Sequence, residues 1–166
     1  MARQASDTAK YLYTLLLYFE EEVMGEAYFH GLKAYFSKAH QRKKLDLLAE
    51  VERCAAEAVR PLLQKHGLVP RSDADLKLVG EQSCEEHGRL DWHGLMTYMS
   101  VRYPGYLDDF AALENMAPDE DLQALQLLTE HEVVAIEFAN RELSGTPDSM
   151  EPLLRYVGRP VVSAAS

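Results

Sequence analysis

The sequence predicts an all-α fold: four long helices packed as a bundle, with a long crossover that contains a short helix between helices two and three. Apolar residues recur at alternating steps of three and four, which is the spacing of the core-facing side of a helix. No alternation of polar and apolar residues is long enough to build a sheet. The segment between Gly67 and Asp91, about 25 residues, is long enough to travel the length of a bundle.

The first half of the chain has few helix-breaking residues. We expect a first helix over about 7–39 and a second over about 43–66, with a polar turn at 40–44 between them. Pro61 lies inside the second helix and predicts a kink or an early end. Gly67 is expected to stop this helix.

The second half of the chain contains more of the proline and glycine residues that end helices. Further helices are expected over about 73–87, 92–116, 118–143 and 150–157. Asp91 suits the N-cap of the third long helix, whose middle must be disturbed by Pro104. Gly145 is expected to stop the fourth. Residues 1–145 are therefore expected to form the bundle and residues 146–166 a tail with one short helix.

Composition excludes several classes of protein. With 17 Lys and Arg against 27 Asp and Glu, the 166-residue chain carries a formal charge of −10, so we expect no binding to nucleic acid or to an anionic membrane. No apolar run approaches the roughly 18–20 residues of a membrane span. The two cysteines, Cys54 and Cys84, are far apart, and no signal peptide is visible; both observations favour the cytoplasm.

Three glutamates interrupt the apolar stripes of the predicted helices. Glu26, Glu52 and Glu132 each occupy a position where an apolar residue is expected, near the middle of a long helix. Counted from the expected turns, the three lie at nearly the same depth in the bundle. His30 and His131 are placed to reach the same layer. Buried carboxylates cannot remain unpaired, so they must protonate, find cations or bind a metal ion.

The third long helix brings Arg102, Tyr103 and Tyr106 to about the same depth. We take these three as candidate catalytic residues, although the sequence does not identify a substrate. Two interpretations of the layer remain open. Carboxylate and imidazole ligands suit iron or manganese, which predicts a metal site formed by the three glutamates and the two histidines. Alternatively, Arg102 and the tyrosines neutralise the glutamates in a metal-free polar core.

The first helix also carries many aromatic and acidic residues. Its five tyrosines predict packing or a dimer face, and we expect a homodimer. They are Tyr11, Tyr13, Tyr18, Tyr28 and Tyr35. The run Glu20-Glu21-Glu22 is interpreted as part of a solvated face.

Short motifs resemble a known group. The segment 131–138, His-Glu-Val-Val-Ala-Ile-Glu-Phe, followed by 142–145, resembles the last helix of ferritin-like, rubrerythrin-related bacterial proteins. Gly25-Glu26-Ala27-Tyr28 resembles their first-helix glutamate segment, and Glu52 with 60–67 is similar to the second helix of a small branch. The resemblance covers residues 8–145. It implies a ferritin-like bundle and redox or oxygen chemistry at a metal site, with a nearby tyrosine stabilising oxygen intermediates.

The chain departs from that family at the metal ligands. Its di-iron members use Glu-x-x-His, and none of the six histidines here has Glu three residues before it. Glu26 and His30, at i and i+4, could supply a different ligand pair, so the site would hold one metal ion, a carboxylate-rich pair or none. Two further possibilities stay open: a metal-free bundle that binds ligands or proteins, and a fold of the haem-oxygenase or thiaminase type with a small-molecule pocket between helices.

Overall fold

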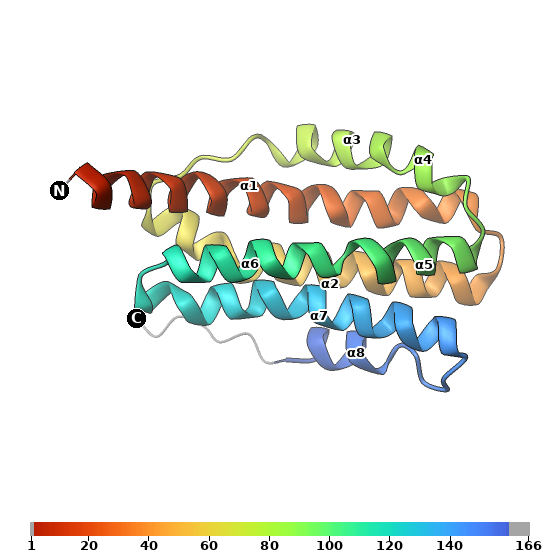
Figure 1. The fold of residues 1–166 in the computed structure, drawn as a ribbon. Coiled ribbons are helices and arrows are strands. Elements are labelled where there is room, and N and C mark those ends of the chain that lie inside the picture. Colours follow the sequence, from red (N-terminus) through yellow and green to blue (C-terminus); the bar gives the residue numbers. More distant parts are fainter. Residues whose placement is uncertain (1, 160–166) are drawn as a thin grey trace.

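The computed structural model describes residues 2–159, and this part of the chain is all-α (Figure 1). The α-helices are α1 (Ala2–Leu32), α2 (Ala39–Lys65), α3 (Asp73–Ser83), α4 (Glu85–Gly88), α5 (Trp92–Arg102), α6 (Pro104–Met116), α7 (Leu122–Ser144) and α8 (Glu151–Val157). Short 3-10 turns cover Lys33–Tyr35 and Asp119–Asp121. None of these helices combines the length and the apolar character that crossing a membrane requires.

The long helices pack side by side as a bundle. Helices α1 and α2 run antiparallel, and α5 with α6 form one interrupted rod that runs antiparallel to α7 (Figure 1). The segment that carries α3 and α4 returns along α1, from the end of α2 to the start of α5. Helix α8 folds back onto α7 and α2. The prediction of an all-α helical bundle is therefore confirmed.

Local chemistry sets several helix ends as predicted. Gly67 follows α2 and Gly145 follows α7 with φ of 65° at both, a left-handed conformation that costs glycine no steric strain. The Asp91 side chain accepts a hydrogen bond from the Gly94 amide and caps α5. Pro104 stands at the first position of α6, so the third long helix is split at Tyr103 as its sequence indicates.

The first reversal of the chain comes earlier than predicted. Helix α1 ends at Leu32, and α2 already begins at Ala39, so the expected turn at 40–44 is wrong. The reversal falls at 36–38 because Phe36 is extended, with φ −119° and ψ 122°, and its buried ring packs edge-on against Trp92 at 5.4 Å. Helix α2 then continues through Pro61, so the early end does not occur.

Apolar packing divides the core into two clusters along the bundle. One surrounds Leu15, Phe19 and Leu128, and the other surrounds Leu45, Met99 and Phe138. Between them, α1, α2 and α7 present polar side chains to one another. The fold thus holds a buried polar layer between two apolar halves.

Candidate metal centre

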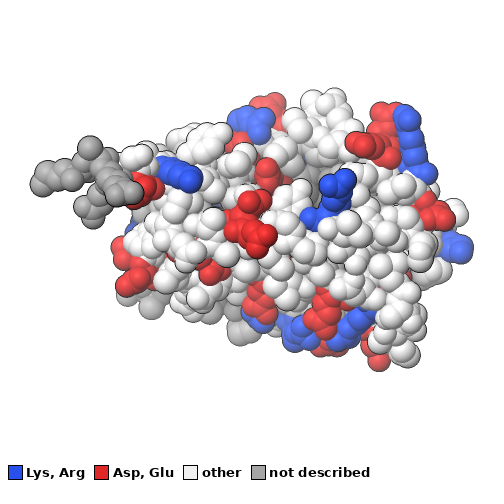
Figure 2. Space-filling model, in the orientation of Figure 1, with Lys and Arg blue, Asp and Glu red and all other residues white. Residues whose placement is uncertain are grey.

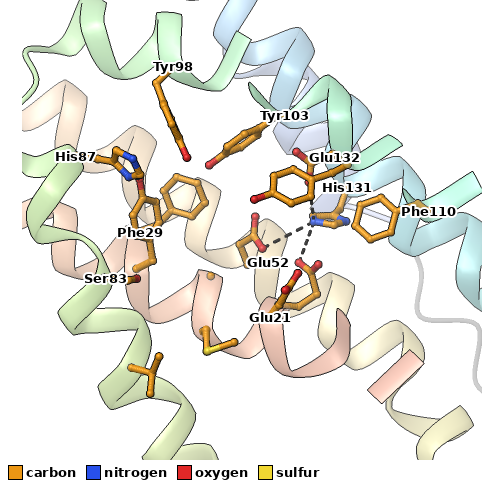
Figure 3. A pocket seen from close by; sticks show the side chains of 16 residues that line it. Glu21, Phe29, Glu52, Ser83, His87, Tyr98, Tyr103, Phe110, His131 and Glu132 are labelled. Atoms are coloured by element: carbon orange, nitrogen blue, oxygen red, sulfur yellow. Dashed lines mark hydrogen bonds and ion pairs between the residues drawn. The ribbon is translucent and has the colours of Figure 1, made fainter. Parts of the chain in front are cut away.

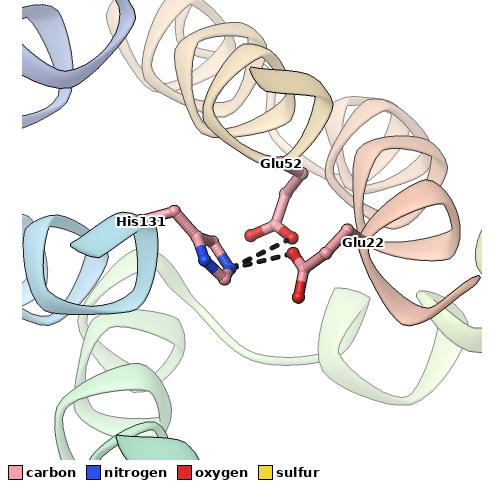
Figure 4. Close-up of side chains that lie close together, drawn as sticks. All are labelled: Glu22, Glu52 and His131. Carbon is pink, nitrogen blue, oxygen red and sulfur yellow. Dashed lines mark ion pairs between the residues drawn. The ribbon is translucent and has the colours of Figure 1, made fainter. Parts of the chain in front are cut away.

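Three helices bring four ionisable side chains into the buried layer. Glu22 comes from α1, Glu52 from α2, and His131 and Glu132 from α7 (Figure 4 shows the first three). Their exposed fractions are 4%, 7%, 1% and 6%, respectively. Such burial removes the charged groups from water and makes their mutual arrangement energetically decisive.

His131 is the centre of this group. Its Nε2 atom lies 2.8 Å from Glu22 Oε2, 3.5 Å from Glu132 Oε2 and 3.8 Å from Glu52 Oε2. The other ring nitrogen, Nδ1, is hydrogen-bonded to the backbone carbonyl of Leu128 and must donate to it. In a neutral imidazole this leaves the lone pair on Nε2, facing the carboxylates. A backbone carbonyl that fixes the tautomer is the usual support of a metal-binding histidine.

Two carboxylate oxygens in the layer are unsatisfied. Glu22 Oε2 and Glu132 Oε1 are buried and have no hydrogen-bond partner among the described residues. Glu22 Oε2 is close to His131 Nε2, but an Nε2 that carries a lone pair has no hydrogen to donate. A buried acceptor without a partner costs about 1–3 kcal/mol, and a charged one more. The layer therefore requires bound protons or a cation.

The raised pKa values of the buried carboxyl groups also indicate that the layer holds protons or a cation. Burial, supplemented by neighbouring carboxylates, raises the pKa of Glu22 and of Glu132 to about 8. Burial and the Glu22 carboxylate raise the pKa of Glu52 well above its usual value. The carboxyl groups of Glu22 and Glu132 would thus keep their protons at neutral pH unless a cation displaces them.

The donor set fits a divalent metal ion. One ligand atom each from Glu22, Glu52 and His131 lie within 4.8 Å of one another. Ligand atoms that surround one ion at about 2.1 Å lie about 3 Å apart when adjacent and about 4 Å apart when opposite. The distances around His131 Nε2 fall in this range. Carboxylates with one imidazole are ligands suited to manganese, iron or zinc.

The structure brings together three of the five predicted metal ligands. Glu52, His131 and Glu132 lie in the cluster, whereas Glu26 and His30 lie outside it. Glu26 is only partly buried, and the exposed His30 places Nδ1 3.4 Å from Asp46 Oδ1. The pair proposed at i and i+4 on the first helix therefore does not face the other ligands.

Sequence reasoning missed Glu22, although a signal for it exists. The chain reverses around Ser37, and Glu22 stands 15 residues before that position while Glu52 stands 15 residues after it. The two are thus level in an antiparallel pair. The prediction that 20–22 forms a solvated face is wrong at two of its residues. Glu22 is buried in the cluster, and the carboxylate of the buried Glu20 accepts hydrogen bonds from Arg71.

The third long helix contributes tyrosines rather than arginine. Arg102 is exposed, and among the described residues no lysine or arginine pairs with the cluster, so the predicted neutralisation by Arg102 is wrong. The break at Pro104 separates α5 from α6 and leaves Tyr103 facing inward. Burial raises the pKa of Tyr103 well above its usual value, with contributions from Tyr28, Glu132 and Glu52. Tyr106 is 40% exposed.

A cleft of about 320 Å³ opens onto the cluster (Figure 3). Its floor holds the four ionisable residues, and its walls come from α1, α3, α4, α5 and α6. The walls carry Glu21, Met24, Gly25, Tyr28, Phe29, Val79, Ser83, His87, Tyr98, Tyr103, Tyr106 and Phe110. Small molecules from solvent thus have a route to the carboxylates.

The candidate centre is therefore a buried Glu, Glu, Glu and His cluster at the base of an aromatic cleft. Comparison of this chain with protein-family models, with curated proteins and with solved structures gave no match.

Proposed function

We propose that this protein binds one divalent iron or manganese ion through Glu22, Glu52 and His131, with Glu132 as a fourth ligand or as an acceptor beside them. One observation carries the proposal: the Nε2 atom of His131 faces three buried carboxylates, two of which have oxygens without a hydrogen-bond partner. A divalent cation would satisfy these groups together, and burial would strengthen its binding to them.

We further propose that the bundle is ferritin-like. The return of α3 and α4 along α1, which makes the second and third long helices parallel, supports this. The ligands come from only three long helices, and the third supplies tyrosines. This distribution favours a single ion over the di-iron pair that the family resemblance implies.

When bound, the metal ion would supply redox or oxygen chemistry. Residues of the chain would hold the ligands in position, keep a proton nearby and limit the access of water. His131 is held by the Leu128 carbonyl and keeps Nε2 directed at the carboxylates. Tyr103, whose raised pKa keeps its phenol protonated, holds a proton beside Glu132 and Glu52. The cleft admits a small molecule while its aromatic walls limit water at the carboxylates.

Metal analysis of matched variants tests the proposal. The protein is purified without chelators, incubated anaerobically with ferrous or manganous salt, desalted and analysed for metal. We expect about one ion per chain in the wild type, and a loss of at least tenfold in affinity in Glu22→Gln, Glu52→Gln and His131→Asn. Glu26→Gln is the matched control, because Glu26 lies one turn from Glu22 outside the cluster. Absence of metal from the wild type, or an equal loss in Glu26→Gln, overturns the proposal.

A metal-free alternative rests on the closeness of the Glu22 and Glu52 carboxyl groups, which could share a proton in a hydrogen bond. In this reading protons neutralise the core, and the bundle serves as a ligand-binding or protein-interaction module. It predicts that the wild type retains neither iron nor manganese and that Glu22→Gln is as stable as the wild type at pH 7, since a neutral amide replaces a neutral acid.

A further inference from the structure

The cleft is lined by acidic side chains and by no lysine or arginine. Among the residues that line it, four are glutamates and none is lysine or arginine. Figure 2 shows acidic side chains gathered near the middle of this face, between α1 and α6. An anionic ligand would find no lysine or arginine in this lining, and the Glu21 carboxylate would repel it in a partly desolvated cleft where charges are poorly screened.

Glu21 is the cleft carboxylate outside the proposed ligand set. It is partly buried on α1 and faces the cleft. Among the described residues no cation pairs with it, and the neighbouring charge that acts on it is Asp109, another acid. Glu21 lines the same cleft as Tyr106 and Glu132.

Aromatic rings form the opposite wall. The rings of Tyr98 and Tyr103 lie 6.2 Å apart and those of Tyr103 and Tyr106 5.9 Å apart, each pair edge to face. His87 packs against Tyr98 at 4.0 Å and is hydrogen-bonded through Nδ1 to the Tyr28 hydroxyl at 2.7 Å. Figure 3 shows the hydroxyls of Tyr98 and Tyr103 directed into the cleft. Aromatic rings and carboxylates that line one cleft are surroundings suited to an organic cation.

We propose that the cleft binds a small organic amine as its ammonium ion, with the charged nitrogen between Glu21 and the Tyr106 ring and the body of the ligand along Tyr103 and Tyr98. In the metal-free protein, Glu132 Oε1, buried in the same cleft and without a hydrogen-bond partner among the described residues, provides an additional acceptor for an ammonium hydrogen. The volume of about 320 Å³ is at the lower end of ligand pockets, which restricts the ligand to a small molecule. This inference goes beyond metal binding and does not depend on it.

Three probes that share one ring and differ in charge test the proposal: benzylamine, benzyl alcohol and benzoate. Binding to the metal-free protein and to the manganese-loaded protein is measured by calorimetry at pH 7. Benzylamine is expected to bind at least about tenfold more tightly than benzyl alcohol, and benzoate not to bind. Equal binding of benzoate and benzylamine, or no binding of benzylamine at millimolar concentration, overturns the proposal.

Variants assign the charge preference to the named residues. Glu21→Gln should weaken benzylamine about tenfold and leave benzyl alcohol unchanged. Tyr106→Leu should also weaken benzylamine, whereas Tyr106→Phe, which keeps the ring, should not. Glu26→Gln, a carboxylate change on the same helix outside the cleft, is the control. If Glu21→Gln leaves benzylamine binding intact, the assignment is wrong.

The metal content of the same variants separates the two proposals. Glu21→Gln should retain the metal of the wild type while losing amine selectivity. If the wild type binds the amine but no metal, the metal proposal alone is wrong. If it binds metal but shows no preference for the amine, this inference alone is wrong.

Discussion

Gly25 on α1 lies against the carboxylate of Glu52 on α2. A Cβ added at Gly25 would stand 3.0 Å from Glu52 Cδ and 2.5 Å from Glu52 Oε2, and the second distance is shorter than Cβ atoms show in proteins. Only a glycine therefore lets the Glu52 side chain occupy its present position between the two helices. The glycine is a positioning residue for the candidate metal centre.

Substituting Gly25 by alanine should displace Glu52 and weaken metal binding. We expect Gly25→Ala to remain helical, since alanine is the better helix former, and to lose at least tenfold in affinity for manganese. Gly105→Ala is the matched control, because a Cβ there meets nothing within 4 Å. Titration calorimetry with manganous salt measures both. An unchanged affinity in Gly25→Ala would show that Glu52 does not need its present position to bind metal.

Metal binding should release protons near neutral pH. The raised pKa values of Glu22 and Glu132, about 8, mean that the metal-free protein holds these protons at pH 7 and that a divalent ion must displace them. We expect release of roughly one to two protons per ion. The number is obtained by calorimetry in buffers of different ionisation enthalpy, and Glu132→Gln should lower it. Binding without any buffer dependence would contradict the assignment of these carboxylates as protonated ligands.

A second buried acid should govern stability at low pH. Asp121 is fully buried and accepts hydrogen bonds from Tyr11 Oη at 2.7 Å, Lys65 Nζ at 2.6 Å and His66 Nε2 at 2.6 Å. Although burial opposes it, these hydrogen bonds, from Lys65 first, lower the pKa of Asp121 below its usual value of 3.8. The folded state thus favours the carboxylate.

The sign of the pH dependence follows from that shift. A carboxyl whose pKa is lower in the folded state stabilises the fold above its unfolded pKa, and the contribution is lost as the pH falls through the folded value. Asp121→Asn should therefore cost about 2 kcal/mol of unfolding free energy at pH 7, and the difference from the wild type should shrink below about pH 4. Urea unfolding at several pH values measures this. A difference that stays constant down to pH 2 would refute the linkage.

Removal of the Arg102 charge should change the stability of the fold little. The side chain is exposed and makes no ion pair with the carboxylate cluster in the described part of the chain, so Arg102→Ala should alter the unfolding free energy by less than about 0.5 kcal/mol. Chemical denaturation of the variant beside the wild type checks this. A strong destabilisation would revive Arg102 as the counter-charge of the glutamates.

The ends of most elements were predictable because they depend on local chemistry. Gly67 and Gly145 adopt the left-handed conformation that stops a helix, and Asp91 caps α5 through its own side chain. The stripe of α2 was also predictable, and both Glu52 and its apolar neighbours are buried as expected. These features require no knowledge of the rest of the molecule.

The ligand on α1 was not predictable from periodicity alone. Apolar residues surround this helix over 11–19, so a stripe can start at Tyr11 or at Leu12 with equal support. The buried face follows Tyr11, Leu15 and Tyr18 and reaches Glu22, whereas the face that starts at Leu12 reaches Glu26. The packing of this helix against α2, α3 and α6, which periodicity does not show, decides between them.

The candidate ligands and much of the cleft wall come from different parts of the chain, although α1 contributes to both. Glu22, Glu52 and the α7 pair stand on the three helices that face one another in the core, while residues 79–110 supply most of the wall. Helix α3, whose last turn enters that stretch, packs extensively against α1, where Gly80 approaches the Met24 carbonyl. Substitutions within 79–110 would therefore change the shape and polarity of the cleft while leaving Glu22, Glu52, His131 and Glu132 unchanged.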